Sequence, residues 1–341
     1  MKQLSDIPLS VLDLAPVATG STARQALADV VDLAQHVERL GYSRLWVAEH
    51  HGMPGIASSS PPVLIGRIAD ATSTIRVGSG GVMLPNHAPL VVAEQFGMLE
   101  ALHPGRIDLG LGRAPGTDQV TAHALRRSAD ALSAEDFPQQ LAALRAFFDD
   151  GFPADHPYAA IRAVPAEGYA PDVWLLGSSG YSAQLAGLLG LPFAFAHHFS
   201  GENTLPALEL YRSRFQPSAI LQEPYAMVCA SVLAADTDEQ AQWLAAPGGL
   251  SWLRLRSGSP GTFPSPEEAA AQNYTPMEAE IVRNRIEAQV IGGPETVRRG
   301  LEDLLARTDA DELMITTTTF EHADRLRSFE LLAGLTRAAA A

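Results

Sequence analysis

The chain alternates short segments rich in β-branched residues with longer segments of helical periodicity along nearly its whole length. Segment 23–40 illustrates the helical pattern, because its apolar residues recur near helical spacing until Gly41 ends it. Strands are predicted at residues 9–14, 44–48, 75–83, 107–111, 173–176, 193–196, 225–233 and 312–316. A repeated strand–helix order predicts a parallel sheet with right-handed crossovers. Eight such units that close on themselves form a (β/α)8 TIM barrel, the α/β fold class predicted here, and an open doubly wound sheet is the alternative.

The other helical patterns follow these strands and leave one long insertion. They cover residues 62–71, 90–102, 133–148, 181–189, 205–214, 238–256, 277–287, 295–307 and 323–335. Ser133 is a candidate N-cap for its helix. No linker rich in Pro, Gly and Ser divides the chain, so we predict a single domain over residues 1–341 with an insertion at about 236–290. Within it, residues 248–276 are typical of a lid or a packing insert.

The charge balance and the single cysteine limit the partners and the compartment. The 39 acidic residues outnumber the 24 basic ones, and the net charge of −15 argues against nucleic acid or an anionic membrane as a partner. Cys229 is the only cysteine, so no intrachain disulfide can form. The N-terminus lacks the apolar core of a signal peptide, and no apolar run is long enough to span a bilayer. A cytoplasmic location is therefore expected.

Five of the predicted strand ends carry polar or glycine-rich sequences. In a TIM barrel the catalytic groups come from the C-terminal ends of the strands. The sequences after the second to sixth strands are Glu49-His50-His51, Gly78-Ser79-Gly80-Gly81, Gly110-Leu111-Gly112-Arg113-Ala114-Pro115-Gly116, Gly177-Ser178-Ser179-Gly180 and His197-His198. We therefore predict the functional site at this end of the barrel.

The two histidine pairs have a structural interpretation as well as a functional one. Adjacent residues at a strand end point to opposite faces, so His50 and His51 face one centre only where the strand bends. Either can be a hydrogen-bonded structural histidine. Together with His197 and His198 they could form a metal site, but the sequence has no His-x-His or HExxH motif and no closely spaced acidic ligands. No metal ligand is therefore predicted.

The segment Gly177-Ser178-Ser179-Gly180 combines two properties of an anion site. It lies between a predicted strand and a predicted helix, and a helix N-terminus offers free N–H groups and a partial positive charge. Arg113, at another strand end, has the planar charged fork that phosphate favours, although a surface salt bridge is the alternative role. These two elements favour a phosphorylated cofactor. A dinucleotide is disfavoured, because Pro115 interrupts the G-x-G-x-x-G pattern.

Several of these motifs resemble the bacterial luciferase-like flavin monooxygenases. Residues 41–51 and 77–85 are similar to that family, and residues 57–61, 104–116 and 176–182 are similar to its alkanal-monooxygenase-like branch. The resemblance is dense over about 9–235 and returns at 292–318, with the motifs in the same order. Residues 248–276 fall in the variable region of the family.

The resemblance implies an FMN site at the C-terminal end of the barrel. His50 matches the catalytic histidine of the family, which lies near the reactive edge of the flavin. The segment Ser79-Gly80-Gly81 matches the stretch beside the isoalloxazine ring, where the family often has a non-prolyl cis peptide. The residues that match the phosphate site are Arg113, Gly177, Ser178, Ser179 and Tyr181, with Ser178 as the best side-chain ligand. Gly112 stands where luciferase has a cysteine, which argues against light emission or a long-chain aldehyde substrate.

The implied activity is that of an FMN-dependent monooxygenase. Reduced FMN, supplied by a separate flavin reductase, reacts with O2 to give a C4a-peroxyflavin that oxygenates a small organic substrate, while the protein orients the flavin and excludes water. His50 would serve as a general acid or base. The resemblance also implies a homodimer formed through helices early in the barrel. The alternatives are a deazaflavin-dependent hydride-transfer enzyme, a flavin-binding protein without turnover, and a metal hydrolase.

Overall fold

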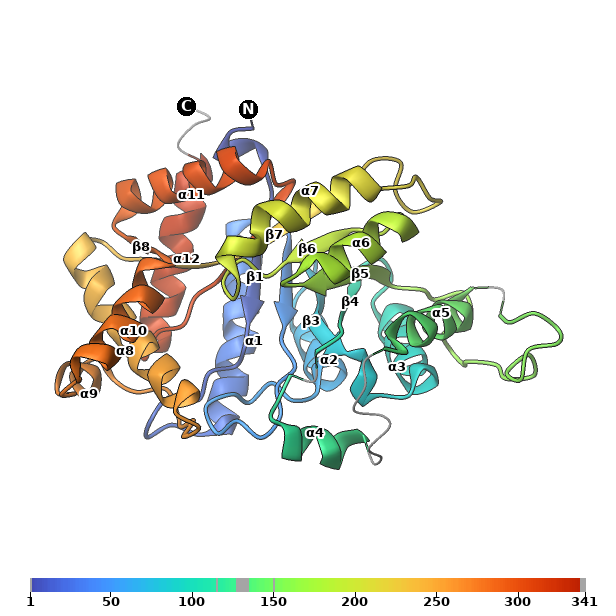
Figure 1. Ribbon diagram of the computed structural model, residues 1–341, viewed down its shortest axis with the longest axis horizontal. Helices are drawn as coiled ribbons and strands as arrows, with labels where there is room; N and C mark the ends of the chain where they lie inside the picture. The colour runs from blue at the N-terminus through green and yellow to red at the C-terminus, as the bar shows by residue number, and fades with distance from the viewer. Residues whose placement is uncertain (1, 115, 127–134, 150, 338–341) are drawn as a thin grey trace.

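The computed structural model, which describes residues 2–114, 116–126, 135–149 and 151–337, contains a closed parallel barrel. Its strands are β1 (Leu9–Asp13), β2 (Arg44–Val47), β3 (Arg76–Met83), β4 (Ile107–Gly112), β5 (Asp172–Gly177), β6 (Phe193–Phe195), β7 (Ala226–Ala234) and β9 (Glu312–Thr316). Strands β1 to β7 pair in chain order, and β9 closes the barrel between β7 and β1. The predicted TIM barrel is confirmed, and the open sheet is wrong. In Figure 1 the strands occupy the centre and the helices surround them.

The helices connect the strands on the outside of the barrel. They are α1 (Ala23–Leu40), α2 (Pro61–Ala71), α3 (Pro89–Leu102), α4 (Gln119–Arg126), α5 (Phe137–Phe148), α6 (Gly180–Leu189), α7 (Thr204–Arg214), α8 (Asp238–Arg256), α9 (Pro266–Ala270), α10 (Pro276–Glu287), α11 (Pro294–Thr308) and α12 (His322–Arg337). The predicted cap Ser133 lies outside the described residues, and α5 begins at Phe137. No described helix combines the length and the apolar character needed to cross a membrane.

The insertion between β7 and α11 lies against the C-terminal end of the barrel. It contains α8, α9, α10 and a three-residue strand, β8 (Val290–Gly292), which pairs with the last residues of β7 outside the barrel. Phe263 ties it to the loop after β1, because its N–H donates to Val17 at 2.8 Å and its carbonyl accepts from Thr19 at 2.8 Å. Figure 1 shows the three helices of the insertion together on one side of the barrel.

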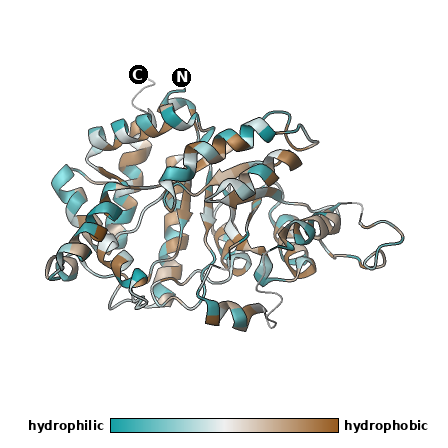
Figure 2. Ribbon diagram, viewed as in Figure 1, coloured by the Kyte–Doolittle hydropathy of each residue, from teal (hydrophilic) through white to brown (hydrophobic). Residues whose placement is uncertain are grey.

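The barrel has two apolar cores because side chains alternate along each strand. Val11, Leu45 and Leu109 point outward and are buried under the helices. Leu12 and Trp46 belong to a smaller core inside the barrel, with Trp174, Met227 and Met314. Figure 2 shows hydrophilic and hydrophobic residues alternating along the outer helices, as expected for helices with one buried face.

An ionic layer fills the N-terminal end of the barrel interior. The Arg44 guanidinium donates to Asp108 at 2.8 Å and to Glu312 at 2.8 Å, and both carboxylates are fully buried. Tyr225 donates its hydroxyl to Glu312 at 2.9 Å. The Trp46 indole N–H donates to Asp108 at 2.8 Å, so this layer fixes the ring that lies above it.

Candidate active site

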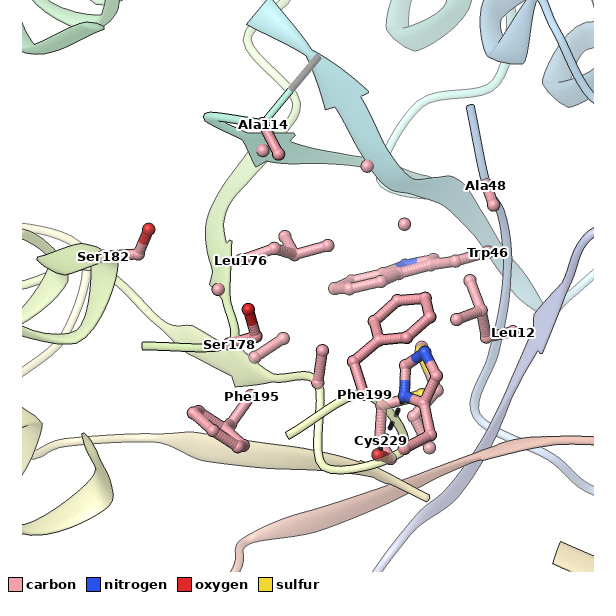
Figure 3. Close-up of a pocket in the computed structure, with 18 of the residues that line it drawn as sticks. Leu12, Trp46, Ala48, Ala114, Leu176, Ser178, Ser182, Phe195, Phe199 and Cys229 are labelled. Atoms are coloured by element: carbon pink, nitrogen blue, oxygen red, sulfur yellow. Dashed lines mark hydrogen bonds between the residues drawn. The ribbon is translucent and has the colours of Figure 1, made fainter. Parts of the chain in front are cut away.

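A pocket opens at the C-terminal end of the barrel, where the sequence predicts the site. This central pocket is lined by residues from all eight barrel strands and the segments that follow them, among them Leu12, Trp46, His50, Gly80, Gly81, Arg113, Ser178, His198, Cys229 and Met314. Figure 3 shows the Trp46 ring extending from β2 toward Leu176, with Ser178 and Ser182 on the opposite side of the pocket. The pocket is therefore apolar at its base and polar at one side.

Trp46 forms the base of the central pocket and has a fixed orientation. Its ring packs edge-on against Trp174, with the ring centroids 5.2 Å apart, and its N–H is held by Asp108. The ring is completely buried in the protein. Sequence reasoning did not assign this residue to the site, although alternation along β2 places it on the same face as Arg44.

His50 and His51 diverge at the end of β2, as the strand geometry predicts. His50 lines the central pocket and places Nδ1 3.1 Å from the carbonyl oxygen of Gly116. His51 instead places Nε2 2.9 Å from Oε1 of Glu49. Burial lowers the pKa of His50 below its ordinary value of 6.5. His50 is therefore a neutral imidazole at pH 7 that faces the pocket.

Glu49 is a fully buried carboxylate that holds this strand end in place. It accepts hydrogen bonds from His51 and His87, each at 2.9 Å, and from the N–H of Met83 at 3.1 Å. Burial alone would raise its pKa, but these hydrogen bonds and the electrostatic interaction with His87 lower the pKa to about 2. Glu49 therefore stays ionised and positions the residues beside His50.

The second histidine pair also diverges. His198 lines the central pocket and places Nδ1 3.1 Å from the carbonyl oxygen of Cys229, and burial lowers its pKa to about 4. His197 turns away and hydrogen-bonds to Thr204 at 2.7 Å. In the described part of the chain, no three His, Cys, Asp or Glu side chains converge as a metal site would require. Sequence reasoning considered His198 only as a metal ligand and missed its place beside His50 in the pocket.

Gly80 and Gly81 line the pocket at a position where a side chain would not fit. Their peptide bond is cis, as the resemblance leads us to expect. A Cβ atom on Gly80 would lie 2.6 Å from Leu12, and one on Gly81 would lie 2.7 Å from the carbonyl oxygen of Gly110. Ser79 is fully buried behind them and donates its hydroxyl to the same carbonyl at 2.9 Å. The two glycines thus form the pocket wall, and Ser79 supports it from behind.

Four of the five residues predicted to bind phosphate line the polar side of the pocket, and the fifth, Tyr181, contacts Arg113 without lining the pocket. Gly177 ends β5, and Ser178 and Ser179 connect it to α6. All three residues line the pocket, and no side chain caps the N-terminus of this helix at Ser179. The Arg113 guanidinium lines the same region and lies over the Tyr181 ring, 4.3 Å from its centroid. No carboxylate of the described residues forms an ion pair with Arg113. Free helix N–H groups beside an arginine without an acidic partner could hold a phosphate group.

Comparisons with known proteins agree with this geometry. Residues 7–312 match the luciferase-like monooxygenase family. The chain is 54% identical over 331 residues to the uncharacterized protein YvbT of Bacillus subtilis, and the match covers 97% of each chain. It is 50% identical over 325 residues to a luciferase-like monooxygenase of Escherichia coli, with 95% of this chain and 96% of the relative covered.

Solved structures share the same fold over nearly the whole chain. Apo-MsnO8 superposes with a TM-score of 0.88 at 37% identity, covering 98% of this chain and 99% of its own. More distant structures show likeness of fold alone. They include a type II Baeyer–Villiger monooxygenase component from Pseudomonas putida in complex with FMN, with a TM-score of 0.71, 19% identity and 97% of each chain covered. An F420-dependent secondary alcohol dehydrogenase has a TM-score of 0.67 at 14% identity, with 97% of this chain and 99% of its own covered.

Proposed function

Because the chain belongs to the luciferase-like monooxygenase family and is a flavin-dependent oxidoreductase, we propose that it uses reduced FMN and O2 to oxygenate a small organic substrate. One observation supports FMN most strongly. The Arg113 guanidinium lies over Tyr181 in the first turn of α6, beside a helix N-terminus that no side chain caps. A terminal phosphate needs such a site, and a flavin without a phosphate would leave it unused.

The residues around the central pocket can hold each part of FMN. The phosphate would bind to Arg113 and to the N–H groups and hydroxyl of Ser178 and its neighbours. The ring system would lie in the apolar part of the pocket, against Gly80 and Gly81. Glycine at these two positions leaves room for a flat ring to contact the backbone.

When bound, reduced FMN supplies the electrons that activate O2 for transfer of one oxygen atom to the substrate. The protein contributes a proton-transfer group and a dry environment. His50 is neutral at pH 7, and donation of its Nδ1–H to Gly116 leaves Nε2 with a lone pair to take up a proton. The apolar lining from Leu12, Trp46 and Met314 excludes water from the reacting groups.

The partners follow from the same proposal. The chemistry consumes reduced flavin, so a separate flavin reductase would supply it. The cytoplasm is the expected location.

A homodimer would form through α2 and α3, which expose apolar side chains to solvent. Val63 is 74% exposed, Met98 53% and Leu102 67%. These two helices contact each other along the outside of the barrel.

Rapid mixing tests the proposal. The protein is loaded with reduced FMN under anaerobic conditions and mixed with oxygenated buffer, and the absorbance of oxidised flavin is followed in time. We expect oxidised flavin to return more slowly than in a matched solution of free reduced FMN, because the pocket shields the cofactor. Return at the rate of free flavin would contradict the proposal. Preferential binding of F420, with hydride transfer and no oxygen consumption, would favour the deazaflavin alternative.

A further inference from the structure

A second cavity adjoins the central pocket on the side of the insertion. This side chamber is bounded by the barrel end at Leu14 and Ser231, by the insertion at Trp252 and Phe263, and by Arg285 of α10. Leu14 lines both cavities, so this residue lies between the two spaces. The side chamber is therefore placed to hold the part of a substrate that does not react.

The side chamber is lined by apolar and polar residues. Met53, Ile56 and Leu233 are among the apolar ones. Of the polar ones, Ser231 donates its hydroxyl to Gln289 at 2.9 Å, and the Gln289 amide donates to the carbonyl oxygen of Arg285 at 2.9 Å. These two side chains carry no charge. Among the described residues that line the chamber, Arg285 alone has a charged side chain.

Arg285 is held in a fixed position without an acidic partner. Its Nη1 donates to the carbonyl oxygen of His198 at 2.9 Å, and its guanidinium lies over the Trp252 ring, 4.8 Å from the centroid. The side chain is half-buried, and burial lowers its pKa. Among the described residues no carboxylate forms an ion pair with it, whereas Arg254 of the same insertion pairs with Glu268 at 2.6 Å.

A half-buried cation without a counterion is costly unless a ligand supplies the negative charge. The guanidinium has five N–H donors in a planar fork, and only one of them is used by His198. Stacking on Trp252 fixes the plane of that fork. A carboxylate is planar and accepts two parallel hydrogen bonds from such a fork.

We infer that the side chamber binds the carboxylate of an anionic organic substrate through Arg285, while its apolar remainder extends past Leu14 into the central pocket. This inference rests on the proposed function for the reaction itself, but the binding site does not depend on it. Arg285 is thus a specificity-determining residue. It also holds the backbone of His198, so the carboxylate site is linked to a residue that lines the central pocket.

Two matched ligands test the carboxylate site. Hexanoate and hexanamide have similar shapes but differ in charge, and their affinities are measured by calorimetry on the FMN-loaded protein and on the apo-protein. We expect hexanoate to bind the parent about tenfold more tightly than hexanamide, the usual contribution of one charge-assisted hydrogen-bond pair. Arg285→Gln should abolish that preference. Arg283→Gln, an exposed position on the same helix, should leave it unchanged.

Further variants separate this site from the phosphate site and from a folding defect. Arg113→Gln should not change hexanoate binding to the apo-protein, and loss of binding there would place the carboxylate at the phosphate site and overturn the inference. Arg285→Lys keeps the charge without the planar fork and should bind hexanoate more weakly than the parent. Equal affinity for both ligands in the parent, or an unchanged preference in Arg285→Gln or Arg285→Lys, would also overturn it. Failure to bind FMN would contradict the proposed function, and the apo-protein measurements would still decide the carboxylate site.

Discussion

His50 and His198 enter the central pocket from different strand ends, and both direct Nδ1 at a backbone carbonyl oxygen 3.1 Å away. Because a carbonyl only accepts hydrogen bonds, each ring carries its proton on Nδ1 and has a lone pair on Nε2. Burial lowers the pKa of both rings, that of His198 to about 4. Neither Nε2 atom has a hydrogen-bond partner among the described residues. The pocket therefore contains two neutral histidines whose Nε2 atoms remain available to ligands.

Replacing His50 should separate catalysis from cofactor binding. We expect His50→Ala to lower turnover by about 10²–10⁴-fold, the usual contribution of a positioned acid or base, while flavin affinity changes little. His51→Ala removes a bond to Glu49 outside the central pocket and should lower thermal stability more than turnover. Steady-state turnover and flavin titration of both variants check this. Loss of turnover in His51→Ala with full activity in His50→Ala would show that His51, and not His50, is the proton-transfer residue.

Glu49 should make stability depend on pH in the acidic range. Its pKa is about 2 in the folded protein and 4.5 ordinarily, so its contribution is fully present above about pH 4.5 and is lost as the pH falls toward about 2. We expect Glu49→Gln to lower the free energy of unfolding by about 3 kcal/mol at pH 7. Urea unfolding should show a difference from the parent of about half that size near pH 3. A difference that stays constant between the two pH values would contradict this account.

The ionic layer inside the barrel should be sensitive to loss of its cation. Arg44→Met leaves Asp108 and Glu312 buried with fewer partners, and we expect the free energy of unfolding to fall by about 3–5 kcal/mol. Arg327→Met is the control, because its pair with Asp236 is exposed and should contribute less than about 1 kcal/mol. Chemical denaturation of both variants measures the difference. Equal losses would mean that the buried layer does not stabilise the barrel.

The proposed dimer surface can be tested with one charged residue. Met98→Glu places a carboxylate on the exposed apolar surface of α3 and should convert the dimer to a monomer in sedimentation equilibrium. Met277→Glu is the matched control, because this residue is 73% exposed on α10, away from α2 and α3. A parent that is monomeric, or a Met98→Glu variant that remains dimeric, would count against this interface.

Local sequence signals were sufficient to predict the barrel elements. Helix α1 was predicted with the boundaries that the structure has, from its apolar periodicity and from Gly41, which adopts the left-handed conformation that ends it. The structure adds that Thr22 caps its first turn. Strand β8 was missed, because three residues are too few for a periodic signal and their pairing with β7 depends on the whole insertion. The short helices α4 and α9 were missed as well.

The site was only partly predictable from the sequence, for a physical reason. Motifs at strand ends placed His50, Gly81, Arg113 and Ser178 at the same end of the barrel, and the structure brings them into one pocket. Trp46 lines that pocket from inside the barrel, where strand tilt decides which side chains reach the cavity. The position of Arg285 depends on how the insertion packs against the barrel, which no local pattern encodes.

The central claim is that the pocket binds FMN through a phosphate site at Arg113 and α6. Its most direct test is an anaerobic titration of reduced FMN and reduced riboflavin into the parent, Arg113→Ala and the exposed control Arg24→Ala. We expect Arg113→Ala to weaken FMN binding by about 1.5–3 kcal/mol, the usual contribution of a charge-assisted hydrogen bond. Riboflavin, which lacks the phosphate, should bind all three proteins about equally. FMN binding to Arg113→Ala as tight as to the parent, or an equal loss for riboflavin, would contradict the claim.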